Sequence, residues 1–384
     1  MTNVDNWKTY KLGEVVNILD YRRVPLSSRQ RELRHGKYPY YGAQGIIDYI
    51  DDYLFDGTYL LVAEDGENLK SKKQNIAQLV SGKYWVNNHA HIMESNGLCD
   101  IRYICYLLNV IDISGYITGS AQPKLNQANL LAISFSLPPL EKQQKIANIL
   151  SSLDDKIEVN RRINDNLEQQ AQALFDESFI NNSALIDTCS KAYLTDIATY
   201  LNGLAMQKFR PGEGEEGIPV LKIKELGQGG CDASSDLCSS SIDRKYIIND
   251  GDIIFSWSGT LLVDVWCGGT CGLNQHLFKV SSDKYPQWFI YYWTKYHLAK
   301  FIRIAKDKAV TMGHIKRGDL EVSEVLIPES SELEKLNNMV APIFKAIIAN
   351  RIENRNLATL RDTLLPKLMS GELSVDDVST DLVC

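Results

Sequence analysis

Clustered cationic side chains are the groups in this sequence with the clearest chemical potential. The stretch Arg22–Lys37 holds six basic residues and one Glu, and Lys295–Arg317 holds seven basic residues and one Asp. A third basic loop spans Lys70–Lys73, and Tyr38–Tyr41 follows the first stretch directly. Lys and Arg neutralise phosphates, while Arg, Asn, Gln and Ser can read the edges of bases. Each stretch alone is compatible with an ordinary solvated surface, but together they favour binding of a nucleic acid.

Motifs for catalysis and for metal binding are missing from the sequence. It has no Gly-x-x-x-x-Gly-Lys-Ser/Thr loop, no Gly-x-Gly-x-x-Gly after an expected strand, and no Asn/Asp-Pro-Pro-Tyr/Phe methyltransferase motif. Glu332–Lys335 resembles a nuclease motif only superficially and lies at the polar start of an expected helix. The pairs Cys231/Cys238 and Cys267/Cys271 do not have the usual spacings of zinc ligands. We therefore predict no catalytic residue and no metal site in this chain.

An internal repeat sets the expected organisation of the chain. Asn160-Arg161 recurs as Asn350-Arg351, an offset of 190 residues, and similar matches surround both pairs. Farther upstream, the stretch 88–92 more loosely resembles 274–278. Repeats of this kind indicate duplicated structural units. The chain is therefore predicted to contain two diverged globular domains, each followed by a better-matched segment.

The two matched segments have the pattern of long helices. Apolar residues recur every three or four positions over 146–174 and again over 336–364, and prolines precede both runs. A run of about 36 residues would form a rod of roughly 54 Å. Each rod could pack on its own domain, but Asn160 and Asn350 on the apolar seams favour pairing of the two rods, because a buried amide needs a partner. The residues predicted to pair or to form a subunit interface are Ile146, Leu150, Leu153, Ile157, Asn160, Leu167 and Leu174 in the first rod, and Leu336, Val340, Ile343, Ile347, Asn350, Leu357 and Leu364 in the second.

Charge divides the chain in the same way. Regions 1–137 and 191–325 each have zero net charge, whereas 138–190 carries −4 and 326–384 carries −3. Short β-rich runs and helical stretches in the neutral regions indicate the α+β class. We expect globular α+β domains at 1–137 and 191–325, helical spacers at 138–190 and 326–376, and a tail at 377–384. An antiparallel coiled coil of the two spacers would relate the domains by a pseudo-two-fold axis.

Composition excludes several other classes of protein. A chain of 384 residues that is 44% hydrophobic can fill two cores of normal size. No apolar run is long enough for a membrane span, and the opening residues lack the apolar core of a signal peptide. The eight Cys are scattered and are expected to be reduced thiols. These features predict a cytoplasmic protein with no membrane partner.

Several motifs resemble those of the specificity (S) subunits of type I restriction–modification systems, and the resemblance extends over nearly the whole chain. The segments Tyr40–Tyr49 and Gly119–Lys124 look like motifs of the family's recognition domains. The continuation of the second motif through Leu137–Gln143 belongs to the same resemblance. Ile146–Leu150 resembles the entry to the family's helical region, and Leu364–Leu373 resembles its usual C-terminal ending.

The resemblance implies a non-catalytic subunit whose two target-recognition domains each read one half of a bipartite, asymmetric DNA sequence. The helical spacers would pair and dock two modification subunits, which bind S-adenosylmethionine and methylate adenine. Restriction subunits would add translocation and cleavage driven by ATP, with Mg also expected on the partners and no cofactor on this chain. The apolar stripes could also drive self-association when the partners are absent.

Candidate DNA-binding residues follow from the basic stretches and from the motifs of the family. Changes near Tyr41, Gln44 or Gln122 are expected to relax specificity at single positions, while loss of Lys306 and Lys308 should weaken binding to all sequences. The candidates are Arg22, Arg23, Arg29, Arg31, Arg34, Tyr41, Gln44, Lys70, Lys72, Lys73, Ser120, Gln122 and Lys124 in the first domain, and Lys208, Arg210, Lys306, Lys308, Thr311, His314, Lys316 and Arg317 in the second.

Two other interpretations stay open at this point. A similar specificity chain could serve a type II-like system with a fused methyltransferase and nuclease. Alternatively, the repeats could bind protein alone and form a structural adaptor. Salt-dependent affinity of the assembled complex for DNA distinguishes the adaptor from both DNA-reading alternatives.

Overall fold

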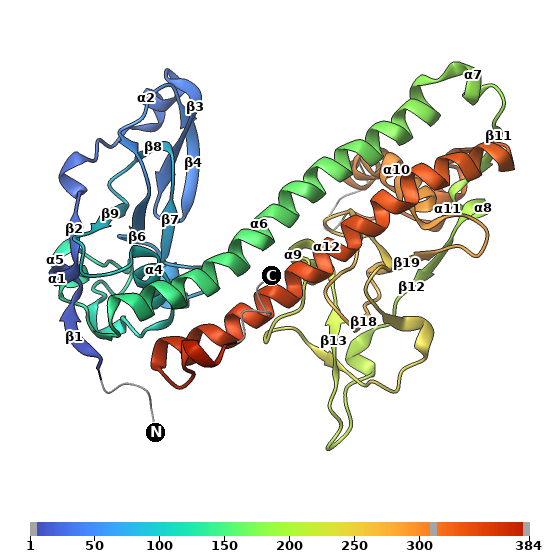
Figure 1. The fold of residues 1–384 in the computed structure, drawn as a ribbon. Coiled ribbons are helices and arrows are strands. Elements are labelled where there is room, and N and C mark those ends of the chain that lie inside the picture. Colours follow the sequence, from blue (N-terminus) through green and yellow to red (C-terminus); the bar gives the residue numbers. More distant parts are fainter. Residues whose placement is uncertain (1–5, 308–312, 379–384) are drawn as a thin grey trace. The chain divides into compact units, whose positions relative to one another are not determined.

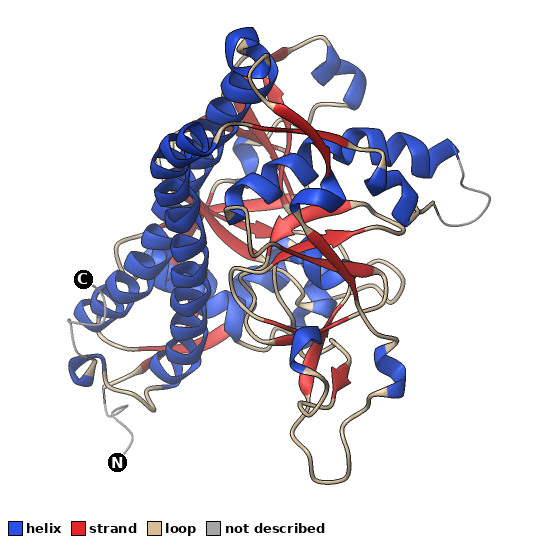
Figure 2. Cartoon of the chain, turned by 90° about the vertical axis from the view of Figure 1, so that its right-hand side faces the viewer, coloured by secondary structure: helices blue, strands red, loops and turns tan. Residues whose placement is uncertain are grey.

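The computed structural model describes residues 6–307 and 313–378, which form two compact units. The first unit comprises Met1–Asp155 together with Ala358–Cys384, and the second comprises Lys156–Leu357. Each unit combines β-sheets with helices, so the predicted α+β class is confirmed (Figure 2).

The first unit is built on two four-stranded sheets and a two-stranded ribbon. One sheet has the strand order β2-β9-β6-β7 and is antiparallel throughout. The other has the order β4-β3-β8-β5, with β3 and β8 parallel. The ribbon pairs β1 with β10. The strands are β1 (Lys8–Lys11), β2 (Val16–Ile18), β3 (His35–Gly42), β4 (Gly45–Ile50), β5 (Phe55–Asp56), β6 (Tyr59–Ala63), β7 (Ala77–Val80), β8 (Lys83–Val86), β9 (Ala90–Ser95) and β10 (Ser134–Leu137).

Helix α4 (Ile101–Val110) shows why the sequence forms this core. Asp100 caps its first turn through the Arg102 N–H, and its apolar residues recur at helical spacing. Tyr103 and Leu107 on the buried face join one core with Leu60 of β6. Helix α4 lies beside β6 (Figure 1). The other short helices of the unit are α1 (Leu12–Val15), η1 (Asp20–Arg22), α2 (Ser28–Glu32), α3 (Asn68–Ser71), η2 (Ser114–Tyr116), α5 (Gln127–Ala132) and η6 (Val375–Asp377).

The second unit repeats the same sheet topology. Its sheets have the orders β12-β19-β16-β17 and β14-β13-β18-β15, with β13 and β18 parallel, and β11 pairs with β20. The strands are β11 (Ser190–Tyr193), β12 (Thr199–Asn202), β13 (Ile218–Leu221), β14 (Leu237–Cys238), β15 (Ile247–Ile248), β16 (Ile253–Ser256), β17 (Leu262–Val265), β18 (Cys271–Leu273), β19 (Leu277–Ser281) and β20 (Glu324–Ile327). The shorter helices are α7 (Ser183–Ile186), α8 (Leu194–Ile197), η4 (Met206–Lys208), α9 (Ile223–Gln228), η5 (Arg244–Tyr246), α10 (Gln287–Asp307) and α11 (Arg317–Glu321).

The strand registers correct the upstream alignment that the sequence suggested. Asn87 donates its backbone N–H to the Tyr41 carbonyl, and Asn274 makes the same bond to the Leu221 carbonyl. Residues 87–89 are therefore equivalent to 274–276, and the predicted match of residue 88 with 274 was wrong by one position. Such a shift matters because successive side chains of a strand point to opposite faces.

Two long helices supply part of the first unit's core. Helix α6 (Leu140–Asp176) begins there, and α12 (Ser330–Ser370) ends there. Ile146 and Leu150 of α6 join one cluster with Leu368 and Met369 of α12, and all four side chains are buried. The first turns of α6 and the last turns of α12 thus complete the hydrophobic core of the first unit.

The second unit uses the opposite ends of the same helices. Leu336 and Val340 of α12, the repeat equivalents of Ile146 and Leu150, join a cluster with Phe175 and Phe179. Phe175 is fully buried and ends α6 together with the π-helical turn η3 (Glu177–Asn181). The apolar stripe therefore packs on the domains as well as on the other helix, so both interpretations of the stripe hold.

Paired asparagines on α6 and α12 define the register of the helices in the second unit. As the sequence predicted, Asn160 and Asn350 each find a partner on the other helix, although they do not bond to each other. Asn160 Nδ2 donates to Asn354 Oδ1 over 3.0 Å and to Glu353 Oε2 over 2.7 Å, while Asn350 Nδ2 donates to Asn164 Oδ1 over 2.9 Å. Because residues 354 and 350 are the repeat equivalents of 164 and 160, the two pairs have the reciprocal pattern of a two-fold contact.

The remaining predicted seam residues lie on or beside this stripe. Leu153, Ile157 and Ile347 are buried, while Leu167, Leu174, Ile343, Leu357 and Leu364 are half-buried. In the part of the chain that the structure describes, no helix is both long and apolar enough to cross a membrane.

Candidate nucleic-acid interface

Four loops of the first unit meet at one edge of its sheets. They are residues 43–44 between β3 and β4, 64–67 after β6, 87–89 after β8, and the segment 118–124, and we call them the first recognition edge. The Leu125 N–H donates to the Glu64 carbonyl, and the Gly66 N–H donates to the Pro123 carbonyl. The His89 ring lies 2.7 Å from an oxygen of Asp65 and joins a third loop to this edge.

This edge brings together five of the predicted DNA-binding residues. Gln44, Ser120, Gln122 and Lys124 are exposed on it, and Lys70 Nζ donates to the Gly119 and Ser120 carbonyls over 3.1 Å. Gly119 has a φ of 80°, and a Cβ there would lie 2.2 Å from the Gln122 carbonyl oxygen, so the tight turn requires glycine. Lys70 therefore holds a loop whose amide and ammonium groups point to the surface.

A buried network of charges supports the first recognition edge. His91 is 1% exposed, with Nδ1 2.5 Å from an Asp20 oxygen and Nε2 2.8 Å from the Leu125 carbonyl oxygen. Arg23 contacts Asp20 and Glu64 over 3.0 Å, and Lys124 lies 3.2 Å from Glu64. Asp20, Glu64 and His91 could together reach one metal ion. Arg23 and Lys124 lie beside these carboxylates and balance their charge within the protein.

The basic stretch before β3 is largely engaged within the protein. Arg31 contacts Asp48 over 2.9 Å, and Arg34 contacts Asp51 over 2.8 Å. The Tyr49 backbone N–H and the Arg31 guanidinium lower the pKa of Asp48. These carboxylates lie on or just after β4. The β3–β4 hairpin therefore neutralises the positive charges of Arg31 and Arg34 in the preceding segment.

The remaining candidate residues of the first unit differ in their surroundings. Arg22 donates to the Leu54 carbonyl and stacks over the Phe55 ring at 4.7 Å. Lys72 lies 3.8 Å from Asp112 and has a left-handed φ of 49°. Within the described residues, Arg29 and Lys73 are exposed and make no ion pair. Tyr41 is half-buried against Tyr84, and burial raises the pKa of its hydroxyl.

The second unit has a corresponding edge, formed by residues 203–210, 257–260, 274–276 and 313–317, which we call the second recognition edge. Its loops after β16 and β18 are equivalent to those after β6 and β8, whereas residues 203–210 precede β13 and have no counterpart in the first recognition edge. The Ile315 N–H donates to the Trp257 carbonyl, and the Gly259 N–H donates to the Gly313 carbonyl. These bonds reproduce those of Leu125 and Gly66 in the first unit. Trp257 thus occupies the position of Glu64, and His314 occupies that of Lys124.

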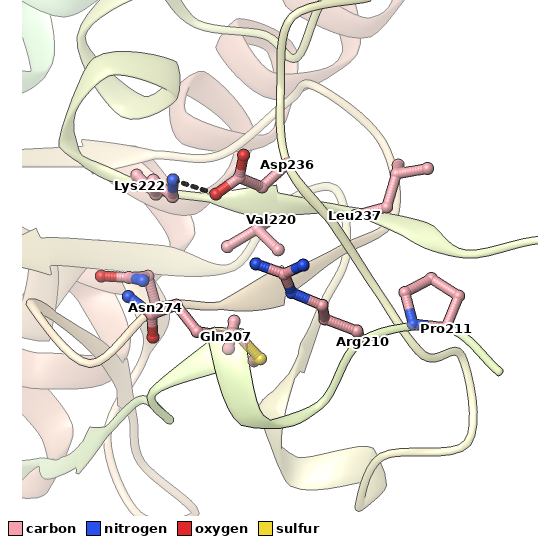
Figure 3. Close-up of a pocket in the computed structure, with 9 residues that line it drawn as sticks. Gln207, Arg210, Pro211, Val220, Lys222, Asp236, Leu237 and Asn274 are labelled. Atoms are coloured by element: carbon pink, nitrogen blue, oxygen red, sulfur yellow. Dashed lines mark hydrogen bonds and ion pairs between the residues drawn. The ribbon is translucent and has the colours of Figure 1, made fainter.

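A pocket of about 370 Å³ opens beside the second recognition edge (Figure 3). Arg210 extends over Val220 in this pocket, and Lys222 and Asp236 form an ion pair on its wall (Figure 3). Val220 is the register equivalent of Tyr40, which is fully buried in the first unit. Val220 is smaller than tyrosine and leaves space at this position. The guanidinium of Arg210 is exposed beside this space, where it suits an anionic group such as phosphate.

The structure places three of the six other second-domain candidates on this edge, namely Lys208, Lys316 and Arg317. Lys208 and Lys316 are exposed and form no ion pair among residues 6–307 and 313–378. Arg317 lies 3.8 Å from Glu321 within α11, and Lys306 is in the last turn of α10. Lys308 and Thr311 lie outside the described residues.

Sequence reasoning missed the aromatic and amide residues of the second recognition edge. Trp257, Gln275 and His276 belong to no basic stretch, and the upstream alignment was shifted by one position. With the correct register, Trp257 would have matched the acidic segment that begins at Glu64. The internal repeat, aligned in the correct register, was therefore the sequence signal that could have identified these residues.

Comparisons with known proteins agree with this architecture. The model of the type I restriction modification DNA specificity domain matches residues 4–169. The MjaIX specificity subunit of Methanocaldococcus jannaschii is 30% identical over 305 residues, which cover 72% of this chain and 70% of that protein. A putative type I specificity subunit of Haemophilus influenzae, S.HindORF215P, is 30% identical over 339 residues, or 86% and 85% of the two chains.

A solved structure shares the fold at low sequence identity. The crystal structure of a type I restriction–modification S subunit from M. genitalium matches with a TM-score of 0.67 at 15% identity, covering 96% of this chain and 97% of that one. The repeated α+β domains and long helices thus define the architecture of a specificity subunit. The chain belongs to the specificity subunits of type I restriction–modification systems.

Proposed function

We propose that this chain binds a bipartite, asymmetric DNA target without catalysing a reaction and directs adenine methylation and restriction by partner subunits. The observation that carries the proposal is the pair of recognition edges. They share backbone hydrogen bonds but differ in side chains, with Glu64 and Lys124 in one where Trp257 and His314 stand in the other. Equivalent scaffolds with different chemistry suit two different half-sites.

The proposed partners are duplex DNA, two modification subunits and restriction subunits. S-adenosylmethionine, ATP and Mg would act on those partners rather than on this chain. The two-fold pattern of the asparagine pairs supports two copies of one partner, because a symmetric helix pair presents equivalent surfaces twice.

A map of N6-methyladenine across the genome, with and without this gene, tests the proposal. We expect loss of methylation at one split, asymmetric sequence when the gene is removed. An unchanged map in cells whose modification subunit is expressed and active would contradict the proposal and favour a protein-only adaptor.

Cations of the second recognition edge are expected to contribute affinity for any DNA sequence. Replacing Lys208 and Lys316 with Ala should reduce the slope of log affinity against log salt by about 0.9 for each phosphate that the variant no longer neutralises. The measurement is a salt titration of the assembled complex on target and non-target duplexes, with both affinities expected to fall by similar factors. A control variant with Lys335→Ala and Lys345→Ala on α12 removes the same charge. Equal slopes for the two variants would remove Lys208 and Lys316 from the interface.

A further inference from the structure

Trp257 occupies a distinctive position on the second recognition edge. It directly follows the buried strand β16, and its backbone is fixed by bonds to the His276 carbonyl and from the Ile315 N–H. Its indole N–H donates to Asn202 Oδ1 over 2.9 Å, which fixes the orientation of the ring. The side chain is half-buried, so part of this oriented ring faces solvent.

Aromatic side chains surround this indole and connect it to the core. The centroid of Phe278 lies 5.8 Å from that of Trp257, and Phe278 in turn contacts Tyr200 and Phe255 of the interior. The His276 ring lies 6.0 Å away, on the side of the loop that follows β18. A column of rings therefore supports the indole from the interior, and the exposed His314 ring lies 6.4 Å from it at the surface.

Two polar atoms beside this column have no hydrogen-bond partner among residues 6–307 and 313–378. Gln275 Oε1 and His276 Nδ1 are buried and unsatisfied. A polar atom left in this state costs about 1–3 kcal/mol in general, so native structures rarely retain one without a reason. The loop next to Trp257 thus has hydrogen-bonding capacity that no other described residue uses.

The first recognition edge has opposite chemistry at the same place. Glu64 replaces Trp257 there, and its carboxylate contacts Arg23 and Lys124. His91 of β9 stands where Phe278 stands in β19, so polar groups replace the supporting rings. An exposed apolar surface is therefore a property of the second edge and not of the shared scaffold.

We propose that Trp257 reads the C5-methyl group of a thymine in the half-site recognised by the second domain. This inference rests on the proposed function. Thymine is the base that presents an apolar group in the major groove, so a rigid indole face can distinguish it from the other bases. The nearby cations Lys208, Arg210 and Lys316 favour duplex DNA as the occupant of this surface.

Replacing thymine with uracil removes only the methyl group and gives a direct test. Each thymine of the target, once the methylation map has defined it, is replaced singly by deoxyuridine in duplexes bound to the assembled complex. We expect one replacement in the second half-site to weaken binding about three- to tenfold, the order expected for one buried carbon group. Trp257→Ala should weaken binding to the thymine duplex by a similar factor and lose all sensitivity to uracil at that position.

Further variants keep the test interpretable. Trp257→Gln retains a donor for Asn202 without an apolar face and replaces Trp257→Ala if the latter lowers the unfolding temperature. Tyr193→Ala removes an exposed aromatic ring from β11 and should keep the uracil effect. The inference is overturned if the folded Trp257 variant retains the uracil effect, or if the wild-type complex selects its target but no uracil weakens binding. Equal binding of the wild-type complex to target and scrambled duplexes would instead contradict the proposed function.

Discussion

A chain that ends at Leu357 is expected to lose the folded first unit, although all residues of its domain before the helices remain. The truncation removes Leu368 and Met369 of α12 and Val375 after it, which are buried in the core of that unit. Full burial of such side chains contributes roughly 1.5–3 kcal/mol each, so the total loss is about 5 kcal/mol or more. A typical domain has only about 5–15 kcal/mol of stability in total.

The unfolding should be confined to the first unit. In a truncated chain, hydrogen exchange should become fast in α4 and β6, while β16 and β19 of the second unit stay protected, because their core uses other ends of the helices. A chain that ends at Val378 is the control, since it retains every core residue of α12. Equal protection of α4 in both chains would show that the end of α12 is not needed to close this core.

The long helices were the part of the fold most accessible from sequence. Apolar spacing over many turns identified α6 and α12, and the prolines marked where they begin. The partners of Asn160 and Asn350 could not be identified in this way. Spacing along one helix fixes its face but leaves the longitudinal register between two helices open, and here the bonds cross to Asn354 and Asn164.

The candidate site was only partly accessible for a similar reason. Gln44, Gln122 and Lys124 lie on loops marked by glycine and proline, and the structure brings these loops to one edge. By contrast, the arginines before β3 were grouped by proximity in sequence alone. Arg31 and Arg34 are paired with Asp48 and Asp51, seventeen residues later in each case, and only the β3–β4 hairpin places those carboxylates nearby.

Trp257 was missed because its importance depends on comparison between the repeats. An aromatic residue after a strand is usually part of a core, and nothing local distinguishes this one. The backbone hydrogen bonds that make Trp257 the equivalent of Glu64 depend on the strand register. A weak sequence repeat does not define this register to within one residue.

The second large effect is expected from shortening both long helices together. Asn160 faces Asn354 and Asn164 faces Asn350 in the second unit, and Asp154 faces Arg361 over 2.6 Å in the first. The segments 151–157 and 357–363 therefore face each other. Removing both takes out Asp154 and Arg361 as a pair, and it retains the asparagine pairs and both domain cores.

Each helix would become shorter by about 10.5 Å and rotate by only about 20°, because seven residues are close to two turns. If the helices set the gap between half-sites, the double deletion should abolish methylation of the original sequence. It should create a new sequence with the same half-sites and a spacer shorter by up to about three base pairs, at roughly 3.4 Å per pair. A methylation map of cells carrying the variant measures both effects.

A single deletion of 151–157 from α6 is the matched control. It removes Asp154, which pairs with Arg361. It also shifts the core residues of the first unit on α6, such as Leu150, relative to those on α12, such as Leu368, so we expect an inactive complex. Retention of the original spacer by the double deletion would show that helix length does not define the distance between half-sites. The asparagine pairs would then serve only to align the helices, and the gap in the target would have to be set by the partner subunits.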